Sequence, residues 1–321
     1  MTEIIIIYLI GLISLFGLFW GGDILVNGTV ETAKFLRVPP HLIAVTIVAL
    51  GTSSPELAVS INAVLSQSPD IAWGNVVGSN IANLLLVLGG ALLFASLKDD
   101  SKSLKIDVFW MTLATVLVFI FGFYYNGINL KVGIFLVLTL VCILIFMALS
   151  SEKKNLPINT NIKKNKFFLT PFQFSLIKIS FGIIIILISS EFLIKSATEL
   201  ASFYKIDESL IGVTIVALGT SLPEISASIS ATRKGYTDIA IGNVLGSNLF
   251  NCLGILGASA LASYPLRLDT PEAFISFDLP IMLVLTLFIG GILFYFKRIN
   301  RIVGPFLVVA YIIYIIFGYI Q

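Results

Sequence analysis

The sequence predicts an all-α polytopic membrane protein whose ten transmembrane helices form two inverted five-helix repeats. Of the 321 residues, 57% are hydrophobic and only 12% are charged. Apolar segments of about 20 residues, the length that crosses a bilayer, recur along the chain. A block of sequence near residue 50 also returns 168 residues later. The apolar segments lack the polar–apolar alternation of transmembrane strands, which excludes a β-barrel.

Ten apolar segments are the expected spans, and most prolines lie between them, where a helix can end. They cover residues near 4–30, 42–66, 71–96, 106–125, 130–149, 172–203, 210–232, 239–263, 274–296 and 302–320. The first is too long for a signal peptide and has no basic stretch before it, so we expect a retained span. Residues 151–171 are polar and predict a cytoplasmic linker between a first repeat, 1–150, and a second, 172–321.

The two halves repeat each other in sequence. Residues 42–60 and 210–228 are identical at 14 of 19 positions, and residues 74–90 and 242–258 at 10 of 17. After the third span the offset between matching residues changes from 168 to 171. Because five is an odd number, the second unit enters the membrane from the opposite side, which predicts inverted repeats.

Basic residues predict the orientation in the membrane. With the N-terminus outside, the inner loops contain 15 of the lysines and arginines, and the outer loops and ends contain 3. Positive charges gather on the cytoplasmic side of membrane proteins. We therefore expect a multi-pass protein of the cell membrane with both termini outside.

Each repeat contains a hydrophobic helix that a proline interrupts. Pro55 has no N–H group, so the carbonyl of Gly51 loses its helical partner, and Pro223 does the same to Gly219. Inside a membrane such carbonyls are tolerated where they line a cavity or hold an ion. The two breaks are therefore candidate ion sites.

An acidic residue follows each proline, and oxygen donors surround it in the sequence. Thr52 and Ser53 lie four and three residues before Glu56, so all three can share a helix face. Ser79 and Asn83 are also four residues apart. The second repeat has the counterparts Thr220, Ser221, Glu224, Ser247 and Asn251. These are hard oxygen donors without histidine or thiolate, which favours Ca²⁺, Na⁺ or Mg²⁺ over zinc or copper.

Plainer interpretations stay open for some of these residues. The two glutamates could form a buried pair that is protonated or hydrogen-bonded, without transport, although intramembrane acids are functional by default. The hydroxyl and amide side chains could simply hold helices together. We expect close packing, not ion binding, at Gly74, Gly78, Gly242 and Gly246. The single histidine, His41, is expected at the membrane interface.

Four other acidic residues also recur between the halves. Asp23 and Glu191 could line an ion path or support the site, but Glu191 could equally pair with Lys195 one turn later. Asp107 and Asp278 stand at the starts of their spans, where helix capping explains them better than transport.

The repeated GTSSPE/GTSLPE and GNVVGSN/GNVLGSN blocks resemble the two alpha-repeats of the sodium/calcium exchanger family, within the wider cation/calcium exchanger superfamily. The resemblance, which is to prokaryotic members with a short linker, implies ten helices that carry ions at the midplane by alternating access. It implies that Glu56 and Glu224 are the central Ca²⁺ and Na⁺ ligands. It adds further side-chain or carbonyl ligands at Ala49, Thr52, Ser53, Ser79, Asn83, Ala217, Thr220, Ser221, Ser247 and Asn251.

The expected function is secondary antiport of Na⁺ for Ca²⁺, electrogenic and independent of potassium. Potassium-dependent members of the family carry an aspartate where this chain has Asn251. We expect no enzyme activity, no cofactor and no binding of nucleic acid. The lipid bilayer is the expected partner, and no obligate protein partner is expected. The alternative is Ca²⁺/H⁺ antiport through the same glutamates. An ion channel would not need two complete copies, and an intramembrane protease would need a nucleophile with an activating partner.

Overall fold

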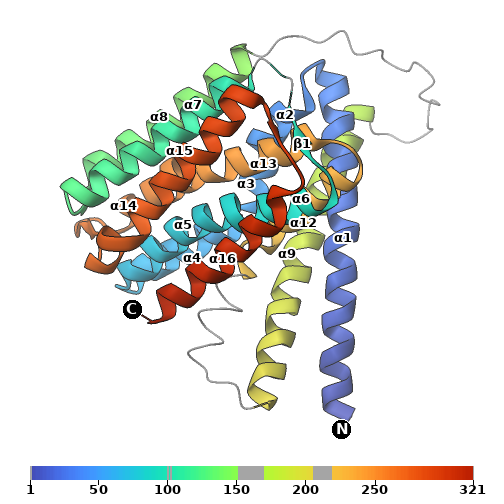
Figure 1. The fold of residues 1–321 in the computed structure, drawn as a ribbon, viewed down its shortest axis with the longest axis horizontal. Helices are drawn as coiled ribbons and strands as arrows, with labels where there is room; N and C mark the ends of the chain where they lie inside the picture. The colour runs from blue at the N-terminus through green and yellow to red at the C-terminus, as the bar shows by residue number, and fades with distance from the viewer. Residues whose placement is uncertain (1, 100, 102, 151–169, 205–218, 321) are drawn as a thin grey trace.

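The structure is a computed structural model that describes residues 2–99, 101, 103–150, 170–204 and 219–320, and it is mostly helical (Figure 1). The first half contains α1 (Thr2–Leu36), α2 (Pro40–Ile43), η1 (Ala44–Val48), α3 (Ala49–Thr52), α4 (Ser54–Leu65), α5 (Pro69–Ala82), η2 (Asn83–Val87), α6 (Leu88–Phe94), α7 (Leu104–Phe119), η3 (Ile120–Tyr124) and α8 (Leu130–Ser150). The second half contains α9 (Pro171–Phe203), α12 (Leu222–Arg233), α13 (Thr237–Leu249), η5 (Phe250–Ile255), α14 (Leu256–Ala262), η6 (Phe274–Asp278), α15 (Leu279–Phe296) and α16 (Val303–Ile320). The η segments are π-helical, with hydrogen bonds between residues five apart.

Within the described residues, seven helices are long and apolar enough to cross a membrane. They are Ile4–Leu36, Pro69–Phe94, Leu104–Tyr124, Leu130–Ser150, Pro171–Phe203, Thr237–Ala262 and Phe274–Phe296. A helix pair bent by 43°, Pro40–Thr52 with Ser54–Leu65, makes an eighth, and Val303–Gly318 is a shorter apolar helix. The expected span near 210–232 lies partly in 205–218, outside the described residues. The prediction of a polytopic helical membrane protein is confirmed at this level.

The helices differ strongly in how much of their surface is covered. Figure 1 shows α1 and α9 side by side, projecting from the other helices. Large apolar side chains on α1 are exposed, Phe16 to 70% and Ile13 to 69%, as expected for a surface that faces lipid. By contrast, the helix Thr237–Ala262 is almost entirely buried. The second-repeat GN…GSN block therefore lies at the centre of the molecule.

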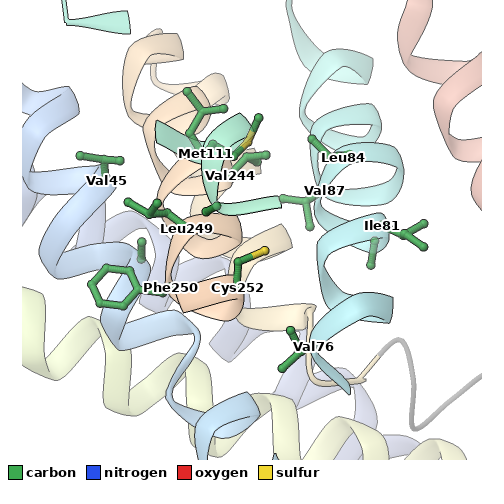
Figure 2. Packing of buried hydrophobic residues seen from close by; sticks show 14 of the residues in the cluster. Val45, Val76, Ile81, Leu84, Val87, Met111, Val244, Leu249, Phe250 and Cys252 are labelled. Carbon is green, nitrogen blue, oxygen red and sulfur yellow. The ribbon is translucent and has the colours of Figure 1, made fainter. Parts of the chain in front are cut away.

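Both halves contribute to one hydrophobic core. Val45, Val76 and Val87 of the first half and Val244 and Leu249 of the second belong to the same buried cluster (Figure 2). Each of these side chains is at most 2% exposed. Neither half could bury its share of this core alone, so the two repeats depend on each other for folding.

Short strands cross-connect the halves. β1 (Leu97–Lys98) pairs antiparallel with β4 (Arg298–Ile299), and β2 (Gly127–Ile128) pairs with β3 (Leu268–Asp269). In sequence, β1 and β3 are 171 residues apart, as are β2 and β4. Each strand thus pairs with the counterpart of the other strand in its own half, and the repeat relates the two pairs to each other.

Helix α1 packs closely on α9 through glycine. A Cβ atom on Gly182 would lie 2.7 Å from the backbone nitrogen of Leu25 and 2.9 Å from the carbonyl oxygen of Gly21. On another side, α12 docks on α1 through hydroxyl groups: Ser226 Oγ donates to the carbonyl of Leu18, and Ser230 Oγ donates to that of Phe19 at 3.4 Å. Small residues and backbone acceptors therefore set the position of α1.

We predict that Gly182→Ala lowers the thermal unfolding midpoint of the purified protein in detergent. The added methyl group meets backbone atoms that cannot rotate away, and such overpacking costs about 1–3 kcal/mol. Gly291→Ala on α15 is the matched control, because a Cβ there meets no described atom within 4 Å. Equal midpoints for the two variants would contradict this account of the α1–α9 contact.

Candidate functional site

The proline breaks form as predicted, but the freed carbonyls have protein partners. Helix α3 ends at Thr52, α4 begins at Ser54, and the axis bends there by 43°. The carbonyl of Gly51 accepts a hydrogen bond from Ser54 Oγ at 2.7 Å. In the second repeat the carbonyl of Gly219 accepts one from Ser190 Oγ at 3.0 Å. Serine hydroxyls thus compensate both carbonyls, where we expected a cavity or an ion.

Glu56 and Glu224 lie in the first turn of α4 and of α12, and each is only 1% exposed. Their carboxylates are near enough to interact electrostatically. Glu224 Oε1 accepts hydrogen bonds from Ser53 Oγ at 3.0 Å and from Ser247 Oγ at 3.5 Å. Ser53 belongs to the first repeat, so the two halves meet at this carboxylate.

Several predicted ligand atoms are buried without a hydrogen-bond partner among the described residues. These oxygens are Glu56 Oε2, Glu224 Oε2, Ser221 Oγ, Asn83 Oδ1 and Asn251 Oδ1. An unpaired polar atom in such a place is costly, because it has lost its water and gained nothing in exchange. Carboxylate, hydroxyl and amide oxygens are the ligands that hard cations prefer. The residues present therefore fit a Ca²⁺ or Na⁺ ion as a substrate.

The other predicted ligand residues differ in their surroundings. Thr52 is fully buried and Ser79 is 5% exposed. The carbonyl of Ala49 accepts from Ser53 N at 3.0 Å and from Thr52 Oγ1 at 3.3 Å, so it already has two donors. Thr220 is half-buried beside the second break. Ala217 lies outside the described residues.

π-Helical turns lie at the two asparagines that the sequence predicts as ligands. Asn83 is the first residue of η2, and Asn251 is the second residue of η5. π-Bulges interrupt the regular hydrogen-bond ladder of an α-helix and often occur at functional sites. The sequence analysis did not predict these turns, because their boundaries carry neither proline nor a change in hydropathy.

Two asparagines that the sequence analysis did not select hold the breaks in place. Asn75 Nδ2 donates to the backbone carbonyl of Glu56 and to Ser60 Oγ, both at 2.8 Å. Asn243 Nδ2 makes the equivalent bonds to Glu224 O at 3.4 Å and to Ser228 Oγ at 3.1 Å. Their repetition could have identified them, since both asparagines belong to the repeated GN blocks.

Asparagines also bridge the repeats. Asn243 Oδ1 accepts from Thr52 Oγ1 at 3.4 Å. Asn83 Nδ2 donates to Asn248 Oδ1 at 3.0 Å, and Asn248 Nδ2 donates to the carbonyl of Asn80 at 3.4 Å. Each of these bonds joins a residue of the first half to one of the second. Their amide orientations leave the Oδ1 atom of Asn83 free for another partner.

The structure shows the surroundings of Asp23 and Glu191, whose roles the sequence left open. Asp23 forms an ion pair with Lys234, whose ammonium lies 3.6 Å from the Asp23 carboxylate. The same ammonium donates a hydrogen bond to the backbone carbonyl of Asp23 at 2.9 Å. Glu191 and Lys195 are both exposed. Neither Asp23 nor Glu191 makes a described contact with the two site glutamates.

Two interpretations of the sequence, both of helix capping, are wrong. His41 is only 1% exposed, and its ring contacts the carboxylate of Asp107. Asp107 therefore has a tertiary partner and does not cap α7. Asp278 accepts a hydrogen bond from Tyr314 OH at 2.7 Å and makes no capping bond. By contrast, Gly242 and Gly246 pack closely as expected, with Cβ positions 2.9 Å from His41 Nδ1 and 2.4 Å from the carbonyl of Val45. The same expectation is wrong for Gly78, where a Cβ would meet no described atom within 4 Å.

Comparison with known proteins points to one family. The family described as "Sodium/calcium exchanger protein" matches residues 6–149 and 174–320. The "Putative antiporter CaxA" of Alkalimonas amylolytica is 33% identical over 311 residues, which is 94% of this chain and 95% of that protein. The "Sodium/calcium exchanger MaX1" of Methanosarcina acetivorans is 33% identical over 349 aligned positions, covering 96% and 97%. The solved sodium-calcium exchanger NCX_Mj superposes with a TM-score of 0.82 at 27% identity, over 97% of this chain and 98% of the other.

We predict that Asn243→Ala weakens Ca²⁺ binding by about tenfold or more, in the range typical for residues that orient metal ligands. The change removes the side-chain donor to the Glu224 carbonyl and the bond from Thr52 across the repeats, so the glutamate loses its fixed position. Isothermal titration calorimetry of the purified protein measures the dissociation constant. Asn62→Ala, at an exposed asparagine of α4, is the matched control. Unchanged affinity in Asn243→Ala would show that the amide has no part in placing Glu224.

Proposed function

The chain belongs to the sodium/calcium exchanger protein family, and on this basis we propose that it exchanges Na⁺ for Ca²⁺ across the cell membrane by alternating access. The observation that carries the proposal is the set of buried, unpaired oxygens contributed by both halves of the chain. Members of this family are transporters and not enzymes. The protein is thus a membrane antiporter, and Na⁺ and Ca²⁺ are its substrates, with no resident cofactor.

Glu56 and Glu224 are the proposed charged ligands. Their hydroxyl, amide and carbonyl neighbours complete the coordination: Ala49, Thr52, Ser53, Ser79, Asn83, Ala217, Thr220, Ser221, Ser247 and Asn251. The fully buried carboxylates support this role, because a buried pair of like charges needs a cation or a proton between them. Asn251 and Asn83 add no charge, so the site has two negative charges and transport is independent of potassium.

The charge count makes the exchange electrogenic. One Ca²⁺ neutralises two ionised glutamates, whereas three Na⁺, the family's usual number, leave the site with one positive charge. Each cycle then moves one net charge, which is worth roughly 2.3 kcal/mol per 100 mV of membrane potential. A tenfold Na⁺ gradient adds about 1.4 kcal/mol per ion. Both terms favour Ca²⁺ extrusion from a cell that is negative inside.

We propose that ten spans form two inverted repeats, residues 1–150 and 172–321, joined by a cytoplasmic linker at 151–171. The reciprocal pairing of β1 with β4 and of β2 with β3 supports this symmetry. So do the matching bonds of Asn75 and Asn243 to the two glutamate carbonyls. Both termini lie outside, in line with the distribution of lysine and arginine. The bilayer is the only partner that this architecture requires.

We predict that proteoliposomes loaded with Na⁺ take up ⁴⁵Ca²⁺ when diluted into Na⁺-free buffer, and that Glu56→Gln and Glu224→Gln each abolish the uptake. Either change removes half the negative charge of the cage. Glu272→Gln, at an exposed glutamate, is the matched control and should transport normally. Full activity in either site variant would refute the assignment. Uptake driven by a pH gradient without Na⁺ would instead support Ca²⁺/H⁺ exchange through the same carboxylates.

We also predict that membrane potential changes the rate of this uptake. Because each Ca²⁺ enters as three Na⁺ leave, the lumen loses one positive charge per cycle. An inside-positive potential, set with valinomycin and external K⁺, should therefore accelerate uptake, and an inside-negative potential should slow it. Rates that do not respond to the potential would point to electroneutral exchange.

A further inference from the structure

The single histidine of the chain is buried among acidic groups from three other elements. His41 lies at the start of α2, and its Nε2 atom is hydrogen-bonded to the Asp107 carboxylate on α7. Its Nδ1 atom lies 3.1 Å from the backbone carbonyl of Asp238 on α13 and 3.0 Å from Asp99 Oδ2, just after β1. These groups are neither among the proposed cation ligands around Glu56 and Glu224 nor next to them in sequence.

The partners of the ring determine its protonation. A carboxylate and a backbone carbonyl only accept hydrogen bonds, so each ring nitrogen must carry a hydrogen to satisfy the partner that faces it. A neutral imidazole has one such hydrogen, and an imidazolium has two. Asp99 and Asp107 are 3% and 4% exposed, so a positive charge between them compensates two buried negative charges. With both carboxylates ionised, a protonated His41 satisfies this arrangement.

A backbone hydrogen bond holds the carboxylate of Asp99 in this cluster. Asp99 Oδ1 accepts a hydrogen bond from Ser101 N at 2.7 Å. Burial would raise the pKa of Asp99, but the hydrogen bond and charge of His41 outweigh it and hold this pKa below its usual value. Asp99, Asp107 and Asp238 are the titratable groups that face the ring from the packed elements.

His41 sits where two ligand-bearing helices cross. From His41, α2 continues through η1 and α3 to Ala49 and Thr52, while α13 leads from Asp238 to Ser247. The two segments pack on each other through Gly242, against His41 and Ala44, and through Gly246, against Val45 and Ala49. A shift of the ring would therefore move the helix that carries Thr52 relative to the helix that carries Ser247.

The cluster has no copy in the second repeat. Position 209, which is 168 residues after His41, is serine, and position 270, the counterpart of Asp99, is threonine. Asp278, the counterpart of Asp107, binds Tyr314 instead. The His–Asp cluster is therefore not a consequence of the internal symmetry.

We infer that His41 is a positioning residue: its imidazolium fixes the crossing of α2–η1–α3 with α13, so that loss of its proton at alkaline pH weakens Ca²⁺ binding at the distant site. The inference rests on the proposed function for its transport readout alone. When the ring is neutral, one of its nitrogens presents a lone pair to a buried acceptor, and the contact becomes repulsive. This weakening of Ca²⁺ binding occurs at alkaline pH. At low pH, protons would instead compete with cations at Glu56 and Glu224.

The protonation state can be measured without transport. Because the chain has one histidine, ¹⁵N-histidine labelling of protein purified without a histidine tag gives the signals of one ring. We expect both ring nitrogens to carry hydrogens at neutral pH and one to lose it on alkaline titration. A neutral tautomer at neutral pH would overturn the inference and leave the proposed transport function untouched.

Transport variants test the consequence. With equal pH on both sides, wild-type uptake should show a half-saturating Ca²⁺ concentration that rises as the ring deprotonates. His41→Gln should raise that concentration by about tenfold, with no alkaline dependence and with the maximal rate retained. Adding Asp107→Asn to His41→Gln removes one uncompensated charge and should restore part of the affinity.

Asp278→Asn is the matched control, because it removes the repeat-related carboxylate without touching the ring, and it should keep the alkaline dependence. Wild-type affinity and pH dependence in His41→Gln would overturn the positioning role. If His41→Gln does not fold, the ¹⁵N titration of the wild-type protein and the pH profile of Asp107→Asn decide the question: an unchanged alkaline profile in Asp107→Asn counts against the inference.

Discussion

Two carboxylates buried inside a membrane protein impose the main constraint on this structure. Glu56 and Glu224 are each 1% exposed, and like charges in a medium of low dielectric repel strongly. The fold does not neutralise them with lysine or arginine among the described residues. Hydroxyl groups of Ser53 and Ser247 donate to Glu224, and several hydroxyl and amide oxygens among the predicted ligands are buried without a partner in the described residues. Such an arrangement is stable with a cation or protons present, so the stability of the fold depends on what occupies this site.

The site exists only when both halves of the chain are assembled. Ser53 of the first half donates to Glu224 of the second, and Thr52 donates to Asn243. The core and the strand pairs connect the halves in the same way. A site at the junction of two similar units can be opened by moving one unit or its peripheral helices, because no single helix encloses it. The pair α1 and α9 is largely exposed, although Val26 and Val30 of α1 belong to this shared core.

The sequence predicts those parts of the structure that repetition marks. Glu56, Asn83 and their partners recur at a fixed offset, and proline marks the helix breaks, so class, spans and candidate ligands could be read from the chain. Contacts between distant elements could not. His41 follows two prolines and looks like a loop residue, yet it is buried against Asp107, 66 residues away. Likewise, nothing near Gly219 in the sequence indicates that Ser190 satisfies its carbonyl. The repeated GN blocks contain Asn75 and Asn243, but the sequence alone did not indicate that these asparagines bind the backbone carbonyls of the two glutamates.

The central claim is that one cation is held by both glutamates at once. An anomalous difference map, from crystals grown with Ca²⁺ replaced by a heavier divalent surrogate, tests it most directly. The account predicts a strong peak within coordination distance, about 2.3–2.6 Å for Ca²⁺-like ions, of carboxylate oxygens from both Glu56 and Glu224. A peak bound by only one of them, or carboxylates that point apart or toward lipid, would contradict it.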